Sequence, residues 1–257
     1  MTHTLQLCTW NIQFGLRLGQ IVGALESHAD FAGLDLLALQ EASEHGRQAD
    51  ARAIASALGP SYESLQATAH VLRGRKQANA LVWNTRRVHV DAHHVLKLPA
   101  HHEVALPRAE RALLRALPRQ SRSSLVVDGR LGHASLRIYV VHFDVVGFAH
   151  KREQLACVLA DARARPPVDT TFIAGDLNTF RVRSRPSWAA LRHAAEAERF
   201  VELTGAIGWT HSVRSLRLKQ KLDAIFVRHA HPLRCRAWAL HTGGSDHIPV
   251  FADIELD

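Results

Sequence analysis

The sequence predicts an α/β protein in which two sheets pack together and helices cover their outer faces. Three observations predict this fold class. The first third of the chain alternates strand-like apolar runs with stretches that have the spacing of amphipathic helices. The middle holds short strand-like runs joined by turns, which is typical of antiparallel sheets. The strand-like runs also end in polar residues, which is where layered α/β enzymes place their chemistry.

The first third predicts the order strand, helix, strand, helix. The strands are expected over residues 5–10 and 35–39, and the helices over residues 17–28 and 47–58. The second strand is almost continuously apolar, which indicates burial on both faces. Asn11 follows the first strand, Glu41 follows the second, and Gly59-Pro60 ends the second helix.

The middle of the chain changes to short runs separated by turns. Strands are expected over residues 62–67, 70–73, 78–84, 88–96, 123–127 and 136–143. Between them, residues 99–120 are harder to interpret. Their segment 108–115 is either a short helix or a mobile basic loop.

The last part begins with a helix over residues 149–164, which Pro166-Pro167 ends. A buried strand over residues 170–174 follows, and it leads into Gly175-Asp176-Leu177-Asn178. The remaining elements are a helix near residues 187–197 and strands over residues 222–227, 235–240 and 248–254.

Composition narrows the class of protein. The 257 residues are 47% hydrophobic, without a linker or repeat, and we expect one catalytic domain over residues 1–257. No apolar run approaches the roughly 20 residues that span a bilayer, and the N-terminus does not resemble a signal peptide. The three scattered cysteines favour neither a disulfide framework nor a zinc cluster, so we expect a cytoplasmic protein. No segment indicates a protein partner.

Eight polar side chains follow or interrupt the predicted strands: Asn11, Glu41, His142, Asp176, Asn178, Asp223, Asp246 and His247. Most of them have an ordinary structural explanation when taken alone, such as a turn for Asp176 and Asn178 or a helix start for Glu41. Asp223 is different, because it interrupts an apolar run and burial of an unpaired carboxylate is costly. His247 is a natural partner for it, since a carboxylate fixes the tautomer of an imidazole.

Six short motifs containing these residues occur in the order seen in the endonuclease/exonuclease/phosphatase superfamily. They are Thr9-Trp10-Asn11, Leu39-Gln40-Glu41, Val141-His142-Phe143, Gly175-Asp176-Leu177-Asn178, Leu222-Asp223 and Ser245-Asp246-His247. The chain therefore resembles this superfamily from Leu5 to Ile254. The resemblance implies a four-layer α/β/β/α sandwich, with two mixed, mainly antiparallel sheets and the site at one edge of both.

The resemblance also implies a metal-dependent hydrolase of phosphoester bonds. Glu41 would be the main ligand of Mg²⁺, for which Mn²⁺ can substitute, with Asn11 beside it and Asp246 as an auxiliary ligand of metal or water. Carboxylate and amide oxygens are the donors that these hard cations accept. The sequence does not decide between one metal ion and two.

The remaining roles are implied in the same way. Asp176 would orient or deprotonate the attacking water, and Asn178 and His142 would hold the non-bridging oxygens of the phosphate. His247, held by Asp223, would stabilise the charge that develops at phosphorus. A catalytically dead scaffold is the minor alternative, disfavoured because Glu41, Asp176 and His247 are all present.

Two departures from the family pattern concern neighbouring residues. Lys221 precedes the Leu-Asp pair where the family often has Arg, and Phe143 follows the histidine where Leu is usual. Glu41 is followed by Ala42-Ser43, without the Glu-Thr-Lys signature of the abasic-site endonucleases. The histidine motif favours instead the branch of secreted-type DNases, sphingomyelinases and inositol phosphatases.

Basic residues suggest how a phosphate-containing substrate is bound. The net charge is +8, which attracts polyanions such as nucleic acid, although an arginine-rich composition alone could produce it. The predicted substrate-binding residues are Arg181, Arg183, Arg185 and Lys221, unless they are ordinary surface charges. We therefore expect a phosphodiesterase, of which a nuclease is one version; the alternative substrates are a phospholipid, as in sphingomyelinases, or a small molecule such as an inositol phosphate.

Overall fold

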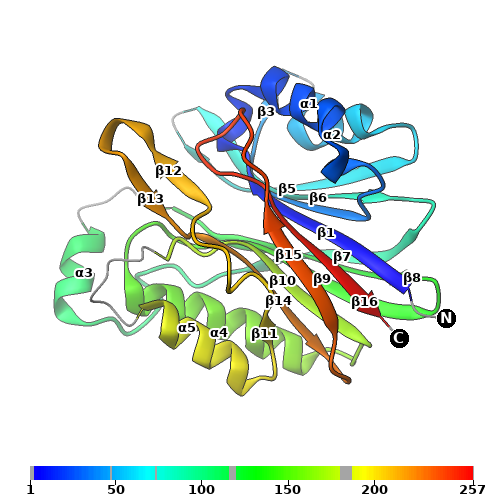
Figure 1. Ribbon diagram of the computed structural model, residues 1–257. Coiled ribbons are helices and arrows are strands. Elements are labelled where there is room, and N and C mark those ends of the chain that lie inside the picture. Colours follow the sequence, from blue (N-terminus) through cyan, green and yellow to red (C-terminus); the bar gives the residue numbers. More distant parts are fainter. Residues whose placement is uncertain (1–2, 47, 73, 116–119, 180–186, 257) are drawn as a thin grey trace.

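The computed structural model describes residues 3–46, 48–72, 74–115, 120–179 and 187–256. Two six-stranded sheets form its centre (Figure 1). The strands of the first sheet are, in spatial order, β15 (Arg234–Ala239), β16 (Val250–Leu256), β1 (His3–Asn11), β2 (Leu36–Ala42), β6 (Arg75–Asn84) and β5 (Tyr62–Leu72). Those of the second are β11 (Val201–Glu202), β14 (Asp223–His229), β10 (Thr170–Asp176), β9 (Ala134–His142), β8 (Ser123–Leu131) and β7 (Val88–Lys97).

Three apolar clusters define four layers. The first lies between the sheets, where Leu36 and Leu81 face Ile138 and Phe172. The second packs α1 (Leu18–Ser27) and α2 (Asp50–Leu58) on the outer face of the first sheet, and the third packs α4 (Phe148–Ala164) and α5 (Ser187–Ala197) on the outer face of the second. Figure 1 shows the two helical layers on opposite sides of the sheets. The expected α/β/β/α sandwich is confirmed.

The pairing of the strands brings the polar strand ends together. β1 pairs with β2, and β9 with β10, in parallel, whereas the other pairs of the two large sheets are antiparallel. Parallel neighbours end at the same edge of a sheet, so the residues after them are adjacent. In the second sheet, Asp176 pairs with His142 on one side and with Asp223 on the other. Long-range strand pairing therefore positions the site.

The structure refines several predicted elements. The two strands expected over residues 62–67 and 70–73 are one strand, β5, with a register shift between Thr68 and His70. The helix expected from residue 47 begins at Asp50, because the two-residue strands β3 (Glu44–His45) and β4 (Gln48–Ala49) precede it. The ambiguous segment forms helix α3 (Arg108–Arg115). A hairpin of β12 (His211–Val213) and β13 (Leu218–Gln220) was not predicted.

Candidate active site

Glu41, His142 and Asp176 meet at the common edge of the two sheets. His142 Nε2 lies 3.7 Å from Glu41 Oε1 and 3.7 Å from Asp176 Oδ2. His247 completes the group, with its Nε2 3.8 Å from Asp176 Oδ2. Glu41 and His247, the first and last of these four residues in the sequence, are more than 200 positions apart. The fold brings all four side chains close enough to contact one small substrate.

Glu41 is turned into the site by an irregularity at the end of β2. Its backbone φ is +53°, and the register between β2 and β6 shifts between Leu39 and Ala42. Gln77, on β6, donates a hydrogen bond to Glu41 Oε1 at 3.2 Å. Burial, and the nearby charge of Asp176, raise the pKa of Glu41 to about 7.

Asp176 is buried and held by two hydrogen bonds. Its Oδ2 accepts one from the side-chain amide of Asn11 at 3.0 Å, and its Oδ1 accepts one from the backbone N–H of Asn178 at 2.8 Å. Burial raises the pKa of Asp176, and the neighbouring Asp223 raises it further. Asp176 is thus a carboxylate with a fixed orientation and increased basicity.

Asn178 is placed by the turn that follows β10. Its φ is +50°, and its side-chain amide donates to the main-chain oxygen of Phe143 at 2.9 Å. Lys151, on α4, donates to the main-chain oxygen of Asn178 at 2.6 Å. Burial lowers the pKa of Lys151 to about 8. Nothing in the sequence distinguishes Lys151 from the other cations of α4.

The expected pair of His247 and Asp223 is present. The distance between His247 Nδ1 and Asp223 Oδ2 is 2.8 Å, and both side chains are buried. Burial alone would lower the pKa of His247, but the charges of Asp223 and Asp176 outweigh it and raise this pKa to about 10. His247 is therefore an imidazolium at neutral pH, and its Nε2–H points toward Asp176.

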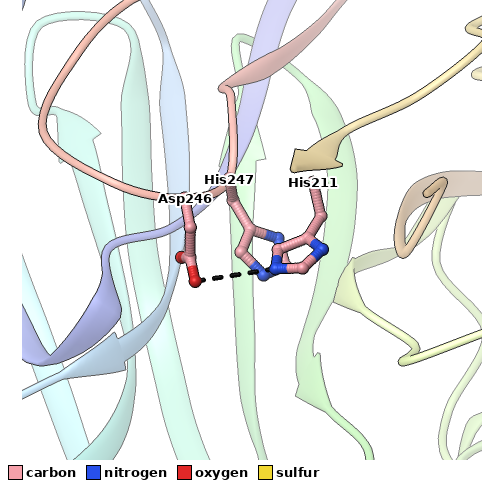
Figure 2. Close-up of side chains that lie close together, drawn as sticks. All are labelled: His211, Asp246 and His247. Atoms are coloured by element: carbon pink, nitrogen blue, oxygen red, sulfur yellow. Dashed lines mark ion pairs between the residues drawn. The ribbon is translucent and has the colours of Figure 1, made fainter. Parts of the chain in front are cut away.

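Asp246 lies beside His247 and contacts residues from two other segments. Its Oδ2 accepts a hydrogen bond from Gln13 at 3.1 Å and lies 3.5 Å from Nε2 of His211, on β12 (Figure 2). The His211 ring also lies against that of His247, with 4.6 Å between centroids. The sequence analysis missed His211, because a single histidine in a short polar segment carries no signal among 18 histidines.

Arg122 is a second residue that the sequence analysis missed. It immediately precedes β8, is only 3% exposed, and lies 3.1 Å from Nδ1 of His142 through its Nη1. Burial, together with the charge of Arg122, lowers the pKa of His142 well below its usual value. His142 is thus neutral, whereas His247 is charged.

The donor set at this edge fits a divalent cation. Within the described ranges, neither Glu41 nor Asp176 forms a salt bridge with Lys or Arg, although burial raises the pKa of both. Beside His247, which as an imidazolium has no lone pair for a metal, lie two further sets of possible ligand atoms within 4.8 Å of one another, namely Asp176 with Asp223 and His211 with Asp246. Clustered buried carboxylates that no Lys or Arg neutralises are the usual surroundings of a bound metal ion.

Of the predicted substrate-binding residues, Lys221 requires a correction. Its side chain is fully buried, and its Nζ donates hydrogen bonds to Glu202 and to the main-chain oxygen of Thr204. It also lies over the ring of Trp188, 5.0 Å from the centroid. A phosphate cannot reach this ammonium group, so its role is to pair with Glu202 in the interior. Arg181, Arg183 and Arg185 lie outside the described residues.

No helix among the described residues is long and apolar enough to cross a membrane. A comparison with curated protein sequences gives no match. Among solved structures, the chain resembles TDP2 of D. rerio in complex with a single-strand DNA product, with 15% identity, 98% of each chain covered and a TM-score of 0.73. It also resembles the mannosyl-6-phosphatase Bt3783 of Bacteroides thetaiotaomicron, with 13% identity, 97% of this chain and 99% of that chain covered and a TM-score of 0.68.

A third similar structure is the endonuclease/exonuclease/phosphatase of Beutenbergia cavernae, with 17% identity, 98% of this chain and 72% of that chain covered and a TM-score of 0.73. Residues 8–247 match the model of the endonuclease/exonuclease/phosphatase family, and this range contains all eight polar residues of the site. Members of this family are hydrolases that act on phosphoester bonds. The chain belongs to the endonuclease/exonuclease/phosphatase family.

Proposed function

We propose that this protein is a Mg²⁺-dependent hydrolase of phosphodiester bonds, with a nuclease as one version of that activity. The proposal rests on the convergence of four side chains at one edge of the two sheets: Glu41, His142, Asp176 and His247. The Nε2 atoms of the two histidines lie no more than 3.8 Å from the nearest carboxylate oxygens. A phosphate bound here would contact the carboxylate base Asp176, the neutral N–H donor His142 and the imidazolium of His247.

Glu41, with Asn11 beside it and Asp246 as auxiliary ligand, would hold the Mg²⁺ ion, and Mn²⁺ would bind in the same place. When bound, such an ion polarises a phosphoryl oxygen and neutralises the charge that develops on it. The raised pKa of Glu41, about 7, supports this assignment, because a nearby cation removes the cost of ionising a buried carboxylate.

Asp176 would act on the attacking water. Among the described residues, the side-chain amide of Asn11 is the one group that donates a hydrogen bond to its Oδ2, and its raised pKa makes Asp176 a better proton acceptor than an exposed carboxylate. Water oxygen forms the new bond to phosphorus as its proton passes to Asp176. The bond from phosphorus to the leaving oxygen breaks on the opposite side.

The phosphate oxygens would be held by donors that converge on the same point. His247 brings a positive charge, which stabilises the additional negative charge of the transition state. His142 Nε2 is buried, and the described structure provides no hydrogen-bond partner for it. One N–H of the Asn178 amide is used by Phe143, which leaves the second for a phosphate oxygen.

The net charge of +8 supports nucleic acid as the polyanionic substrate. One structural relative was solved with a single-strand DNA product, which is consistent with this class of substrate. Exposed Arg217 and Lys219 lie on the β12–β13 hairpin, whose His211 contacts the site. A strand bound across the site would pass near these cations.

A second candidate is a phospholipid or small phosphorylated molecule. Leu216 and Leu218, at the tip of the same hairpin, are 71% and 42% exposed, which favours contact with an apolar surface. A cavity of about 370 Å³ beside Asp246 is lined by Trp209 and His241 and could hold the organic group of a small phosphoester. Trp188, in contrast, is partly buried and packs against Phe226 of the core.

The test is a hydrolysis panel with Mg²⁺, with Mn²⁺ and with chelator. The substrates are single-stranded DNA, plasmid DNA, RNA, sphingomyelin vesicles, phosphoinositides, an inositol phosphate and the chromogenic diester bis-p-nitrophenyl phosphate. We expect cleavage of diesters with Mg²⁺ and none with chelator. Asp176→Asn should lower the rate by at least about 10²-fold without loss of folded structure.

The control for this variant is Asp169→Asn, because Asp169 is a hydrogen-bonded carboxylate just before β10 at the opposite end of the strand. It should hydrolyse the diester at the wild-type rate. If Asp176→Asn and wild type turn over equally, the assigned base is wrong. If only monoesters are cleaved, the diester assignment fails and a phosphatase remains.

A further inference from the structure

Arg122 makes a hydrogen bond to His142 whose direction is fixed by chemistry. A guanidinium group has N–H donors and no acceptor, so its contact with a ring nitrogen is a hydrogen bond only if that nitrogen carries a lone pair. Arg122 Nη1 lies 3.1 Å from His142 Nδ1. Nδ1 is therefore the acceptor, and a neutral His142 must carry its proton on Nε2.

The other contacts of Arg122 leave it little freedom to move away. Its Nε donates to Asp144 at 2.9 Å, its Nη1 also donates to Gln77 at 2.9 Å, and its Nη2 donates to Gln120 at 2.7 Å. Both N–H groups of Nη1 are thus used, one by His142 and one by Gln77. Arg122, His142 and Gln77 are each 3% exposed, so water does not compete with this network.

Gln77 extends the same network to the other side of the site. Its Oε1 accepts from Arg122, which leaves its amide N–H groups facing Glu41, and Nε2 donates to Glu41 Oε1 at 3.2 Å. One buried cation therefore sets the orientation of two side chains that face the reacting group, His142 directly and Glu41 through Gln77.

The proton on Nε2 is aimed into the site. Nε2 is 3.7 Å from both Glu41 Oε1 and Asp176 Oδ2, which is beyond hydrogen-bond distance, and it has no hydrogen-bond partner within the described residues. A buried N–H without a partner is costly unless a ligand satisfies it. We propose that Arg122 is a positioning residue that fixes His142 as the Nε2–H tautomer, so that this N–H donates to a non-bridging oxygen of the substrate phosphate.

The catalytic part of this proposal rests on the proposed function, whereas the tautomer assignment does not. The opposite tautomer would direct the Nδ1–H at the N–H groups of Arg122 and would leave a lone pair facing the two carboxylates. Such a site would repel a phosphate oxygen. The two tautomers therefore predict opposite behaviour from the same ring.

The experiment is ¹⁵N nuclear magnetic resonance of the histidine rings in wild type and in Arg122→Met, which keeps most of the side-chain volume and removes all N–H donors. His142→Gln identifies the His142 signals among those of the 18 histidines. In wild type we expect a protonated Nε2 and an unprotonated Nδ1. In Arg122→Met we expect a mixture of tautomers or the Nδ1–H form, and a fall in kcat on bis-p-nitrophenyl phosphate of about tenfold or more, with a smaller change in KM.

Arg137→Met is the matched control. Arg137 is also 3% exposed, pairs with Asp128, and lies on β9, but it is five residues before His142 and does not touch it. Both variants lose a buried ion pair, so a purely structural effect lowers the melting temperature and the rate in both. A change of His142 tautomer is expected in Arg122→Met alone.

Two results would overturn the proposal: an Nδ1–H tautomer in wild type, or a His142 spectrum that is unchanged in folded Arg122→Met. If Arg122→Met does not fold, the wild-type spectrum still decides the tautomer. If wild type shows the expected tautomer but hydrolyses no phosphoester, the proposed function fails and the assignment of His142 remains.

Discussion

Two histidines of the site differ in charge because their partners differ. His142 accepts a hydrogen bond from the cation Arg122, and its pKa is lowered by burial and by that charge. His247 is equally buried but is paired with Asp223, and its pKa is raised to about 10. One ring is therefore a neutral donor and the other a cation, a division of roles set by the environment and not by the residue type.

The charge of His247 leads to a prediction for Asp223→Asn. Loss of the carboxylate should lower the pKa of His247, so that less imidazolium is present at alkaline pH. If hydrolysis requires the imidazolium, wild-type activity falls only as pH rises through about 10, and the variant should lose activity at lower pH. At pH 8 we expect kcat/KM to drop by about 10²-fold. The measurement is a pH profile with bis-p-nitrophenyl phosphate.

The same pair contributes to stability with a definite sign. The pKa of His247 in the folded protein is above the value of about 6.5 expected in the unfolded chain. The charged His247 therefore contributes fully to the free energy of unfolding below about pH 6.5. This contribution is lost as pH rises from about 6.5 to about 10. Asp223→Asn should flatten this dependence, whereas Asp253→Asn, a control in the middle of β16, should not. Identical stability curves for wild type and Asp223→Asn would refute the pairing.

At this scale the sequence predicted the carboxylates of the candidate site and two of its histidines, His142 and His247, but neither His211 nor the supporting cation Arg122. Asp223 stood out because it interrupts an apolar run, and that contrast also suggested His247 as its partner. Arg122 lies in a polar stretch just before β8, where an arginine normally indicates an exposed loop. Lys221 was misassigned for the same reason, since its burial depends on Glu202, which is distant in sequence.

In β10, Gly175 has no room for a side chain, because the main chain of the neighbouring strand β9 lies too close. Gly175 has a φ of +150°, and a Cβ built there would lie 1.9 Å from the main-chain oxygen of Val141, on β9. We predict that Gly175→Ala lowers the free energy of unfolding by about 3 kcal/mol or more, because neither backbone can move without breaking the β9–β10 ladder. Urea unfolding followed by circular dichroism measures this change.

Gly23→Ala is the control for this prediction. Gly23 is exposed on α1, and a Cβ there would meet no atom within 4 Å. An alanine in an exposed helix position should stabilise the protein by up to about 1 kcal/mol. Equal effects of the two substitutions would show that β9 and β10 are not packed as closely as described.

Elements with a strong local pattern were predicted, whereas those that depend on distant partners were not. β2 and β10 are short apolar runs, and α4 has apolar residues at helical spacing, so each was found close to its true bounds. The strands β12 and β13 have three residues each and alternate in no clear way. They pair with each other, and the main-chain link between His211 and His247 ties them to the site.

The whole molecule brings the site together through the packing of its two sheets. Asn11 and Glu41 come from the first sheet, and His142 and Asp176 from the second. The order of motifs along the chain predicted this convergence only through resemblance to a family. No local sequence pattern determines how the two sheets are positioned against each other. That residues 1–257 form one domain stays a prediction.

The net positive charge of the whole molecule predicts how hydrolysis of nucleic acid depends on salt concentration. With a net charge of +8, cleavage of single-stranded DNA should weaken as salt rises, whereas hydrolysis of bis-p-nitrophenyl phosphate should change little. If the β12–β13 hairpin contacts the strand, Arg217→Gln and Lys219→Gln should each reduce the slope of log kcat/KM against log salt by about 0.7. Arg86→Gln is the control, because this exposed arginine lies in the turn after β6, at the end of the sheet away from Gln77 and Glu41. If the slope is the same in wild type and in all three variants, the hairpin does not bind the DNA strand. A slope of zero in wild type would favour a small or lipid substrate, and Leu216 and Leu218 are then the residues to test.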